Sequence, residues 1–140
     1  LSLRRRTSVP IIWDELALNE EDILQIASDD GAEGIGLKIS KNGGLTKCRR
    51  QRDICLAASY TMSIQDTTGS DIAFAAIVHL GQTLPKKYLR CILDCRDMVT
   101  VKTADGEFEV TNGFVSAPKS FGLGITPRID VLGQPLVSYG

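Results

Sequence analysis

Short apolar runs alternate with longer amphipathic stretches over the first two thirds of the chain. The apolar runs predict buried strands, and the stretches between them, with apolar residues at helical spacing, predict helices. Strict alternation of the two is typical of a parallel α/β layer or barrel, and it argues against a sandwich or a helix bundle. The predicted strands are 9–13, 34–39, 61–64 and 89–93, and the predicted helices are 20–27, 45–58 and 71–80.

The pattern changes past the fourth predicted strand. Two β-type runs, 99–103 and 108–110, flank an Asp105-Gly106 turn and predict a β-hairpin. Glycine and proline then punctuate the rest of the chain, which we interpret as a tail that wraps over another domain. The predicted division is therefore an α/β part and a hairpin with tail, residues 1–97 and 98–140.

The first residues predict the end of a helix that began earlier. Arg4, Arg5 and Arg6 suit the negative end of a helix dipole, and Pro10 prevents the helix from continuing. We therefore expect this chain to be part of a longer protein.

Charge and composition exclude several partners. Sixteen Lys and Arg against seventeen Asp and Glu give a net charge of -1, so no electrostatic attraction to nucleic acid or to an acidic membrane is expected. No apolar run approaches the roughly 20 residues that span a bilayer. We expect a cytoplasmic protein with no nucleic-acid or membrane partner. The cysteine spacings match no zinc or redox motif and predict reduced, buried thiols at Cys48, Cys55, Cys91 and Cys95.

Polar residues recur near the ends of the four predicted strands. Asp14, Lys38, Asp66 and Asp94 follow one another at intervals of 24, 28 and 28 residues, one strand-helix unit each. Because the carboxyl ends of parallel strands open on one face, these side chains are predicted to share it. A carboxylate suits a divalent cation, a lysine suits proton transfer, and further acids suit a cationic substrate group. The alternative is that four independent units simply end in polar residues.

Lys38 has two interpretations of its own. Burial and neighbouring charges could lower its pKa toward neutrality and make it a general base. Otherwise it is an edge-strand lysine that points into water.

Two segments carry a resemblance to a known family. Residues 12–15, Ile-Trp-Asp-Glu, and residues 37–45, Leu-Lys-Ile-Ser-Lys-Asn-Gly-Gly-Leu, resemble the fifth and sixth barrel strands of the enolase superfamily, in its mandelate racemase and muconate-lactonizing enzyme group. Residues 118–125 are similar to the family's closing segment. The resemblance implies the C-terminal half of a TIM-type (β/α) barrel, strands five to eight, with a tail that packs on a capping domain.

The resemblance also implies site roles. Lys38 would be the acid/base, Asp14 a magnesium ligand, Glu15 a neighbour that supports the ligand, and Lys41 and Gln65 supporting groups. A closer similarity to the cis-3-hydroxy-L-proline dehydratase branch is carried by residues 65–71, 93–98 and 124–128. It implies substrate-binding roles for Asp66, Thr67, Thr68 and Asp94.

The same segments argue against a dipeptide epimerase. Those relatives carry a glutamate at the end of the seventh strand and an Asp-x-Asp pair on the eighth. Here Gln65 or Asp66 stands near the first position, and Asp94 with Arg96 replaces the pair.

The reaction that the resemblance implies is magnesium-dependent removal of the α-proton of cis-3-hydroxy-L-proline, followed by loss of water to give pyrroline-2-carboxylate. The partners would be a small hydroxy-amino acid and the N-terminal part of the same protein, in a homo-oligomer when full length. Alternatives are an amino-acid or proline-betaine racemase/epimerase of the superfamily, and a non-catalytic structural half-barrel. The family's other metal ligands and second lysine lie outside this chain, so the 140 residues alone are predicted to be inactive.

Overall fold

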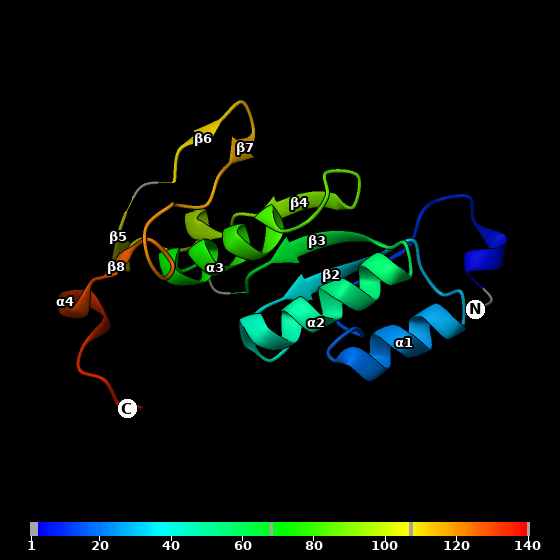
Figure 1. Ribbon diagram of the computed structural model, residues 1–140, viewed down its shortest axis with the longest axis horizontal. Helices are drawn as coiled ribbons and strands as arrows, with labels where there is room; N and C mark the ends of the chain where they lie inside the picture. The colour runs from blue at the N-terminus through cyan, green and yellow to red at the C-terminus, as the bar shows by residue number, and fades with distance from the viewer. Residues whose placement is uncertain (1–2, 68, 107, 140) are drawn as a thin grey trace.

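A four-stranded parallel sheet forms the centre of the molecule, which we describe from a computed structural model over residues 3–67, 69–106 and 108–139. The strand order is β1-β2-β3-β4. Each strand leads through one helix to the next (Figure 1), as the alternating sequence pattern predicts. The strands are β1 (Ile12–Trp13), β2 (Gly34–Lys38), β3 (Thr61–Gln65) and β4 (Leu89–Leu93), and the helices are α1 (Glu20–Ser28), α2 (Gly44–Ala57) and α3 (Asp71–Gln82).

The helices begin where local sequence signals place them. Asn19 caps α1 in a reciprocal capping box with Asp22, and the Ser70 side chain accepts a hydrogen bond from the third residue of α3. The helix α2 follows Gly43, whose φ of 87° is a left-handed conformation that glycine adopts without strain.

The hydrophobic core lies between the sheet and the three helices. Ile35 and Leu37 of β2 pair with Met62 and Ile64 of β3, and all four side chains are fully buried. Consecutive parallel strands joined by right-handed crossovers place their helices on one face of the sheet. The other face carries Lys38 and the two glycines that precede it at alternate positions in β2, so the catalytic candidate lies on the face away from the helices.

The predicted helix end includes residues outside the described part of the chain, which begins at Leu3. Arg4–Arg6 form a three-residue 3-10 turn and Thr7 is extended, so a helix that precedes them stays a prediction. Arg4 forms ion pairs with Asp30 at 3.2 Å and with Glu33 at 2.5 Å, which join this turn to the segment before β2.

The predicted hairpin was wrong in its position. The observed hairpin joins β6 (Val110–Thr111) to β7 (Phe114–Val115), and its turn is Asn112-Gly113 with φ angles of 52° and 77°. Asn-Gly suits two consecutive positive φ angles, which a tight hairpin turn requires.

The segment expected to form the first hairpin strand is held elsewhere. The Asp71 carboxylate accepts hydrogen bonds from the backbone N–H and the hydroxyl of Thr103. Next to it, β5 (Ala104–Asp105) pairs antiparallel with β8 (Thr126–Pro127).

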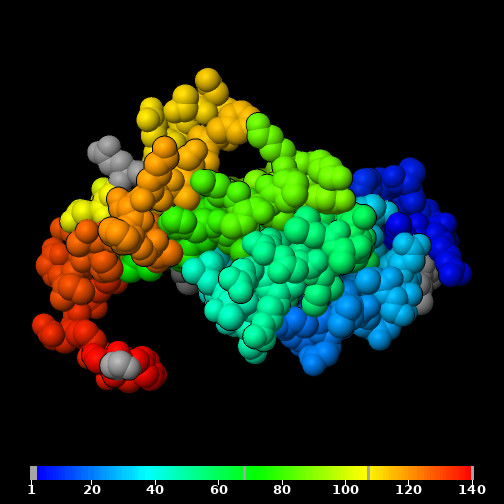
Figure 2. Space-filling model, in the orientation of Figure 1, coloured from blue at the N-terminus to red at the C-terminus, as the bar shows by residue number. Residues whose placement is uncertain are grey.

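The C-terminal residues extend from the body. After the short helix α4 (Ile129–Leu132), the last described residues trail away from the main mass, on the opposite side of the molecule from the first described residues (Figure 2). Phe121, Leu136 and Tyr139 are almost fully exposed. The interpretation of this tail as a wrapping segment stays a prediction. Within the part of the chain that the structure describes, no helix has the length and apolar character to cross a membrane.

Candidate active site

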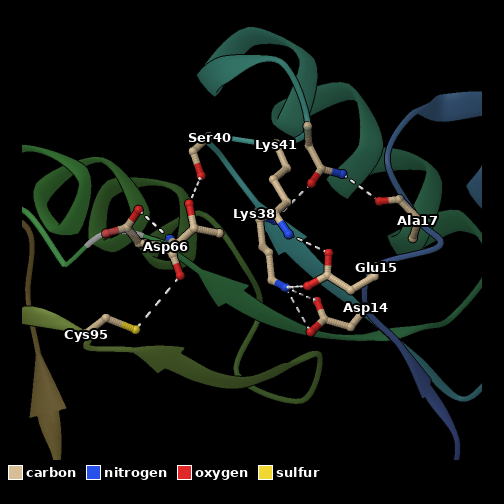
Figure 3. Close-up of polar contacts among 10 residues, drawn as sticks. Asp14, Glu15, Ala17, Lys38, Ser40, Lys41, Asp66 and Cys95 are labelled. Atoms are coloured by element: carbon tan, nitrogen blue, oxygen red, sulfur yellow. Dashed lines mark hydrogen bonds and ion pairs between the residues drawn. The ribbon is translucent and has the colours of Figure 1, made fainter. Parts of the chain in front are cut away.

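Two lysines and two acids form an ion-pair cluster at the carboxyl ends of β1 and β2 (Figure 3). Lys38 Nζ donates to Asp14 Oδ2 at 3.0 Å and to a carboxylate oxygen of Glu15. Lys41 Nζ donates to the other oxygen of Glu15 at 2.5 Å. Glu15 therefore bridges the two lysines, and Lys38 lies between two carboxylates. The edge-lysine alternative does not describe Lys38, which is only 8% exposed.

The ion pairs shift the pKa of Lys38 in the direction opposite to the one that the sequence suggested. Burial alone lowers the pKa of Lys38, but hydrogen bonds to Glu15 and Asp14 outweigh it, so the pKa is raised above its usual value. Hydrogen bonds from Lys38 and Lys41 lower the pKa of Glu15 to about 2. The expectation of a pKa lowered toward neutrality was therefore wrong, because two carboxylates lie beside the ammonium group.

Gln65 and Asp14 meet over β2 at Gly36. A Cβ atom added to Gly36 would lie 2.7 Å from Gln65 Nε2 and 2.8 Å from Asp14 Oδ1. Gln65 is also the register partner of Lys38 in β3. Gln65, predicted to have a supporting role, therefore reaches the cluster. It can do so because position 36 has no side chain, a contribution that the sequence pattern did not indicate.

A buried asparagine fixes the turn that carries Lys41. The Asn42 side chain accepts a hydrogen bond from the backbone of Lys38 at 3.1 Å and donates to the Ala17 carbonyl at 2.7 Å and to Gln51 at 2.8 Å. The residue is 3% exposed. Asn42 therefore ties the ends of β1 and β2 to α2. The Asn-Gly-Gly sequence signalled a turn but not this network.

Asp66 braces a loop. Its two carboxylate oxygens accept from the backbone N–H groups of Thr67 and Gly69, each at 2.6 Å, and the residue is 5% exposed. Thr67 Oγ1 lies 2.5 Å from Ser40 Oγ, which joins this loop to the one after β2 (Figure 3). Thr68, the third predicted substrate contact here, lies outside the described residues.

Asp94 is held by Arg96. Arg96 Nε lies 2.9 Å from Asp94 Oδ1 and its terminal nitrogen lies 2.7 Å from Oδ2, a two-pronged contact that holds the pKa of Asp94 below its usual value. The guanidinium also stacks 3.8 Å over the Phe74 ring, and Phe108 packs edge-on against Phe74. Asp94 and Arg96 line a cavity of about 240 Å³ whose lining includes neither lysine of the cluster. The four predicted strand-end residues are therefore not all in direct contact.

The described residues do not make a complete magnesium site by themselves. They contain no group of three or more His, Cys, Asp or Glu side chains arranged to hold a metal. Asp14 nevertheless fits one ligand. Its Oδ1 is buried and accepts no hydrogen bond from the described residues, although Lys38 Nζ is 3.0 Å away as an ion-pair partner. A carboxylate oxygen with unused lone pairs is the donor that Mg²⁺ prefers.

The cysteine prediction is half confirmed. Cys48 and Cys55 are buried, and burial raises their pKa values to about 11 and about 12. Cys91 is exposed and Cys95 is half-buried. The difference arises because Cys91 lies on the open face of β4, in register with Ser63.

The fold and the cluster define a class. A lysine and a carboxylate at the ends of adjacent parallel strands, within half of a (β/α) barrel, are the arrangement that the sequence resemblance implied. Residues 1–131 match the family described as Enolase C-terminal domain-like, and the chain belongs to that family.

Named relatives make the placement more specific. The chain is 40% identical over 139 residues to cis-3-hydroxy-L-proline dehydratase of Roseibium aggregatum, covering 99% of this chain and 38% of the relative. A crystal structure from Aspergillus oryzae, of a protein assigned to the mandelate racemase/muconate lactonizing enzymes, is 68% identical with a TM-score of 0.93, covering 99% of this chain and 38% of that one.

A second similar structure contains a metal. It comes from Roseovarius nubinhibens ISM, is assigned to the same enzymes, and is complexed with magnesium. It is 46% identical with a TM-score of 0.93, covering 99% of this chain and 38% of that one. The chain thus spans about two fifths of the length of each relative described here.

Proposed function

We propose that the full-length protein is a magnesium-dependent dehydratase that acts on cis-3-hydroxy-L-proline. The observation that carries this proposal is the contact between the Lys38 ammonium group and the Asp14 carboxylate at the ends of adjacent strands. This contact joins an acid/base group to a carboxylate of the kind that binds Mg²⁺. The 40% identity to a cis-3-hydroxy-L-proline dehydratase supports the choice of substrate.

The proposed reaction is a proton abstraction followed by elimination. Lys38 Nζ takes the α-proton, and the electron pair of that C–H bond forms the new double bond. The C–O bond to the 3-hydroxyl breaks, and the hydroxyl takes up the proton that Lys38 removed and leaves as water. The resulting enamine becomes pyrroline-2-carboxylate. When bound, magnesium would stabilise the negative charge that develops on the substrate carboxylate, with Asp14 as one ligand.

The carboxylates beside Lys38 position it for proton transfer. Hydrogen bonds to Glu15 and Asp14 raise its pKa despite burial. Glu15 and Asp14 hold the side chain in place. Charged partners on both sides restrict the rotation of a long, flexible lysine chain, which is the pre-organisation that a proton transfer requires.

We propose the substrate contacts at the ends of β3 and β4. Thr67, whose hydroxyl faces Ser40, would contact the substrate hydroxyl. Asp94, kept ionised by Arg96, would attract the substrate ammonium group. Asp66 would act with them, and its observed hydrogen bonds stabilise the loop that presents Thr67. Thr68 belongs to the same proposed set.

The test is turnover by the full-length protein with magnesium in heavy water. We expect water loss and a pyrroline product, with Lys38→Met lowering kcat about 10³-fold, within the range for loss of a positioned acid/base. Lys41→Met is the matched control. It removes a lysine from the same cluster, and we expect a change of less than about tenfold.

The result that would overturn the dehydratase proposal is deuterium in recovered substrate of inverted configuration, with no pyrroline product. That outcome indicates a racemase or epimerase that uses the same lysine. Equal losses of kcat in Lys38→Met and Lys41→Met would contradict the assignment of Lys38 as the acid/base.

A further inference from the structure

Gly36 lies at the point where two strands send polar side chains toward the cluster. It is buried, in a strand whose five residues are all buried. The position where its Cβ would lie is 2.7 Å from Gln65 Nε2 and 2.8 Å from Asp14 Oδ1, closer than a carbon atom can approach either. The side chains of Asp14, which follows β1, and of Gln65 in β3 therefore occupy the volume that any other residue would fill at this position.

Gly34, two residues earlier on the same face, provides a contrast. A Cβ there would lie 2.8 Å from the backbone oxygen of Thr61. That oxygen belongs to a hydrogen-bonded strand and cannot move without disturbing the sheet. The atoms that face Gly36 are the ends of two side chains, which can rotate away at small cost to the fold.

One of the two side chains that would have to move is Asp14, which contacts Lys38. Asp14 Oδ1 and Oδ2 each lie 3.0 Å from Lys38 Nζ. Rotating the carboxylate away from Gly36 changes these distances and also the direction in which its free lone pairs point. A methyl group at position 36 thus affects the geometry of Asp14 more than it affects β2.

We propose that Gly36 is a positioning residue, whose missing side chain lets Asp14 and Gln65 converge over β2 and aims the Asp14 carboxylate at the metal. The inference rests on the proposed function only in that Asp14 is a magnesium ligand. It adds a requirement beyond the identity of the cluster residues. Position 36, two residues before Lys38 in β2, must carry no side chain.

The test measures magnesium affinity by calorimetry in the full-length protein, together with thermal unfolding. We expect Gly36→Ala to bind Mg²⁺ at least about tenfold more weakly, within the range for groups that orient a metal ligand, while the unfolding temperature falls by only a few degrees. Gly34→Ala is the matched control on the same face. We expect Gly34→Ala to lower the unfolding temperature more than Gly36→Ala does. The Mg²⁺ affinity of the folded Gly34→Ala protein should fall by less than twofold.

A second variant separates displacement of Asp14 from displacement of Gln65. In Gly36→Ala/Gln65→Ala the new methyl group no longer meets the amide, but it still lies 2.8 Å from the parent position of Asp14 Oδ1. We therefore expect this double variant to bind Mg²⁺ as weakly as Gly36→Ala alone. If Gly34→Ala does not fold, the comparison between the single and double variants at position 36 still decides.

Each remaining outcome has a defined meaning. Affinity of Gly36→Ala within twofold of the parent overturns the inference, and so does a double variant that regains the parent affinity, because Gln65 and not Asp14 would then account for the loss. If the parent binds Mg²⁺ but does not dehydrate hydroxyproline, the proposed function fails. The Mg²⁺ affinities of the variants still test the positioning role of Gly36. If the parent binds no Mg²⁺, both proposals fail.

Discussion

At the scale of single residues, the environment of Lys38 decides what the lysine can do. A lysine in an apolar strand could have been a neutral base, yet Asp14 and Glu15 keep it charged. Glu15 in turn accepts hydrogen bonds from both Lys38 and Lys41, which lower its pKa to about 2. The same rule acts at the end of β4, where Arg96 keeps Asp94 ionised. The Lys38 contacts join segments more than 20 residues apart, which no local sequence pattern specifies, whereas Arg96 lies only two residues from Asp94.

The pair of Asp94 and Arg96 gives a prediction about pH. The pKa of Asp94 is lowered, so its stabilising contribution is present above the unfolded-state pKa and is lost as pH falls through the folded-state pKa. We expect Arg96→Gln to raise the pKa of Asp94 toward its usual value, measured by carbon-detected NMR titration of the carboxyl group. The change should matter only in acid, with stability at pH 6–8 showing no pH dependence from this group.

A separate acid in the same protein is the control for that titration. Asp130 has its own arginine, Arg128, at 3.0 Å, and its pKa is lowered independently. It should titrate identically in the parent and in Arg96→Gln. An Asp94 pKa that does not move in the variant contradicts the role given to Arg96.

The cysteines give a prediction about reactivity. The thiolate is the reactive form, and burial raises the pKa values of Cys48 and Cys55 to about 11 and about 12. With iodoacetamide at pH 8, we expect the folded 140-residue chain to be labelled at the exposed Cys91 and unlabelled at both buried thiols, as read by peptide mass spectrometry. Denatured chain should be labelled at all four cysteines. Equal labelling of Cys55 and Cys91 before denaturation would contradict the burial described.

At the scale of elements, the turns after the strands position the site more than the strands do. The turn after β2 is fixed by Asn42 and by Gly43 and Gly44, both of which have positive φ angles. The loop after β3 is fixed by Asp66. The Ser40 to Thr67 contact joins the two. The helix ends, by contrast, depend on local caps such as Asn19, which is why their positions could be predicted.

The two asparagines give a matched prediction about stability. Asn42→Ala removes three hydrogen bonds in a buried network, and we expect it to lower the free energy of unfolding by about 3 kcal/mol because the partners stay buried and unpaired. Asn19→Ala removes a helix cap, and we expect a loss of about 1 kcal/mol. Urea unfolding of the 140-residue chain measures both.

That comparison uses one substitution at two kinds of position, so any general effect of replacing asparagine by alanine cancels. Equal losses for the two variants would contradict the buried network.

At the scale of the whole molecule, the sheet is one half of a closed structure. Both of its outer strands, β1 and β4, have a free edge among the described residues. The face that carries Lys38 is open as well, as the exposed Leu93 and Cys91 on β4 illustrate. A barrel closes such edges by pairing them and fills its interior with side chains.

The open half-barrel leads to a prediction about activity. We expect the 140-residue chain to bind magnesium weakly and to show no turnover of cis-3-hydroxy-L-proline, because the described residues hold no metal-binding group of three ligands. Adding the remaining part of the full-length protein in trans should restore activity, measured as pyrroline product. Turnover by the 140 residues alone would refute the first expectation, and failure of trans-complementation with a correctly folded complex would favour a structural half-barrel.

The sequence by itself determined the order and type of the main elements and the placement of Asp14 and Lys38 at strand ends. Buried apolar runs, helical periodicity and caps act over a few residues, so they can be predicted without a structure. The hairpin shows the limit of local reasoning: Asp105-Gly106 and Asn112-Gly113 both signal turns, and only the capture of Thr103 by Asp71 decides between them.

The tertiary structure alone decided which groups meet. It placed Glu15 between two lysines, directed the Asp66 carboxylate to its own loop, stacked Arg96 on Phe74 and brought Gln65 beside Asp14 over Gly36. Each of these contacts joins residues on different elements, or depends on how the chain turns after a strand. Burial and charge at the site follow from these contacts, and for that reason the raised pKa of Lys38 could not be predicted from the strand that carries it.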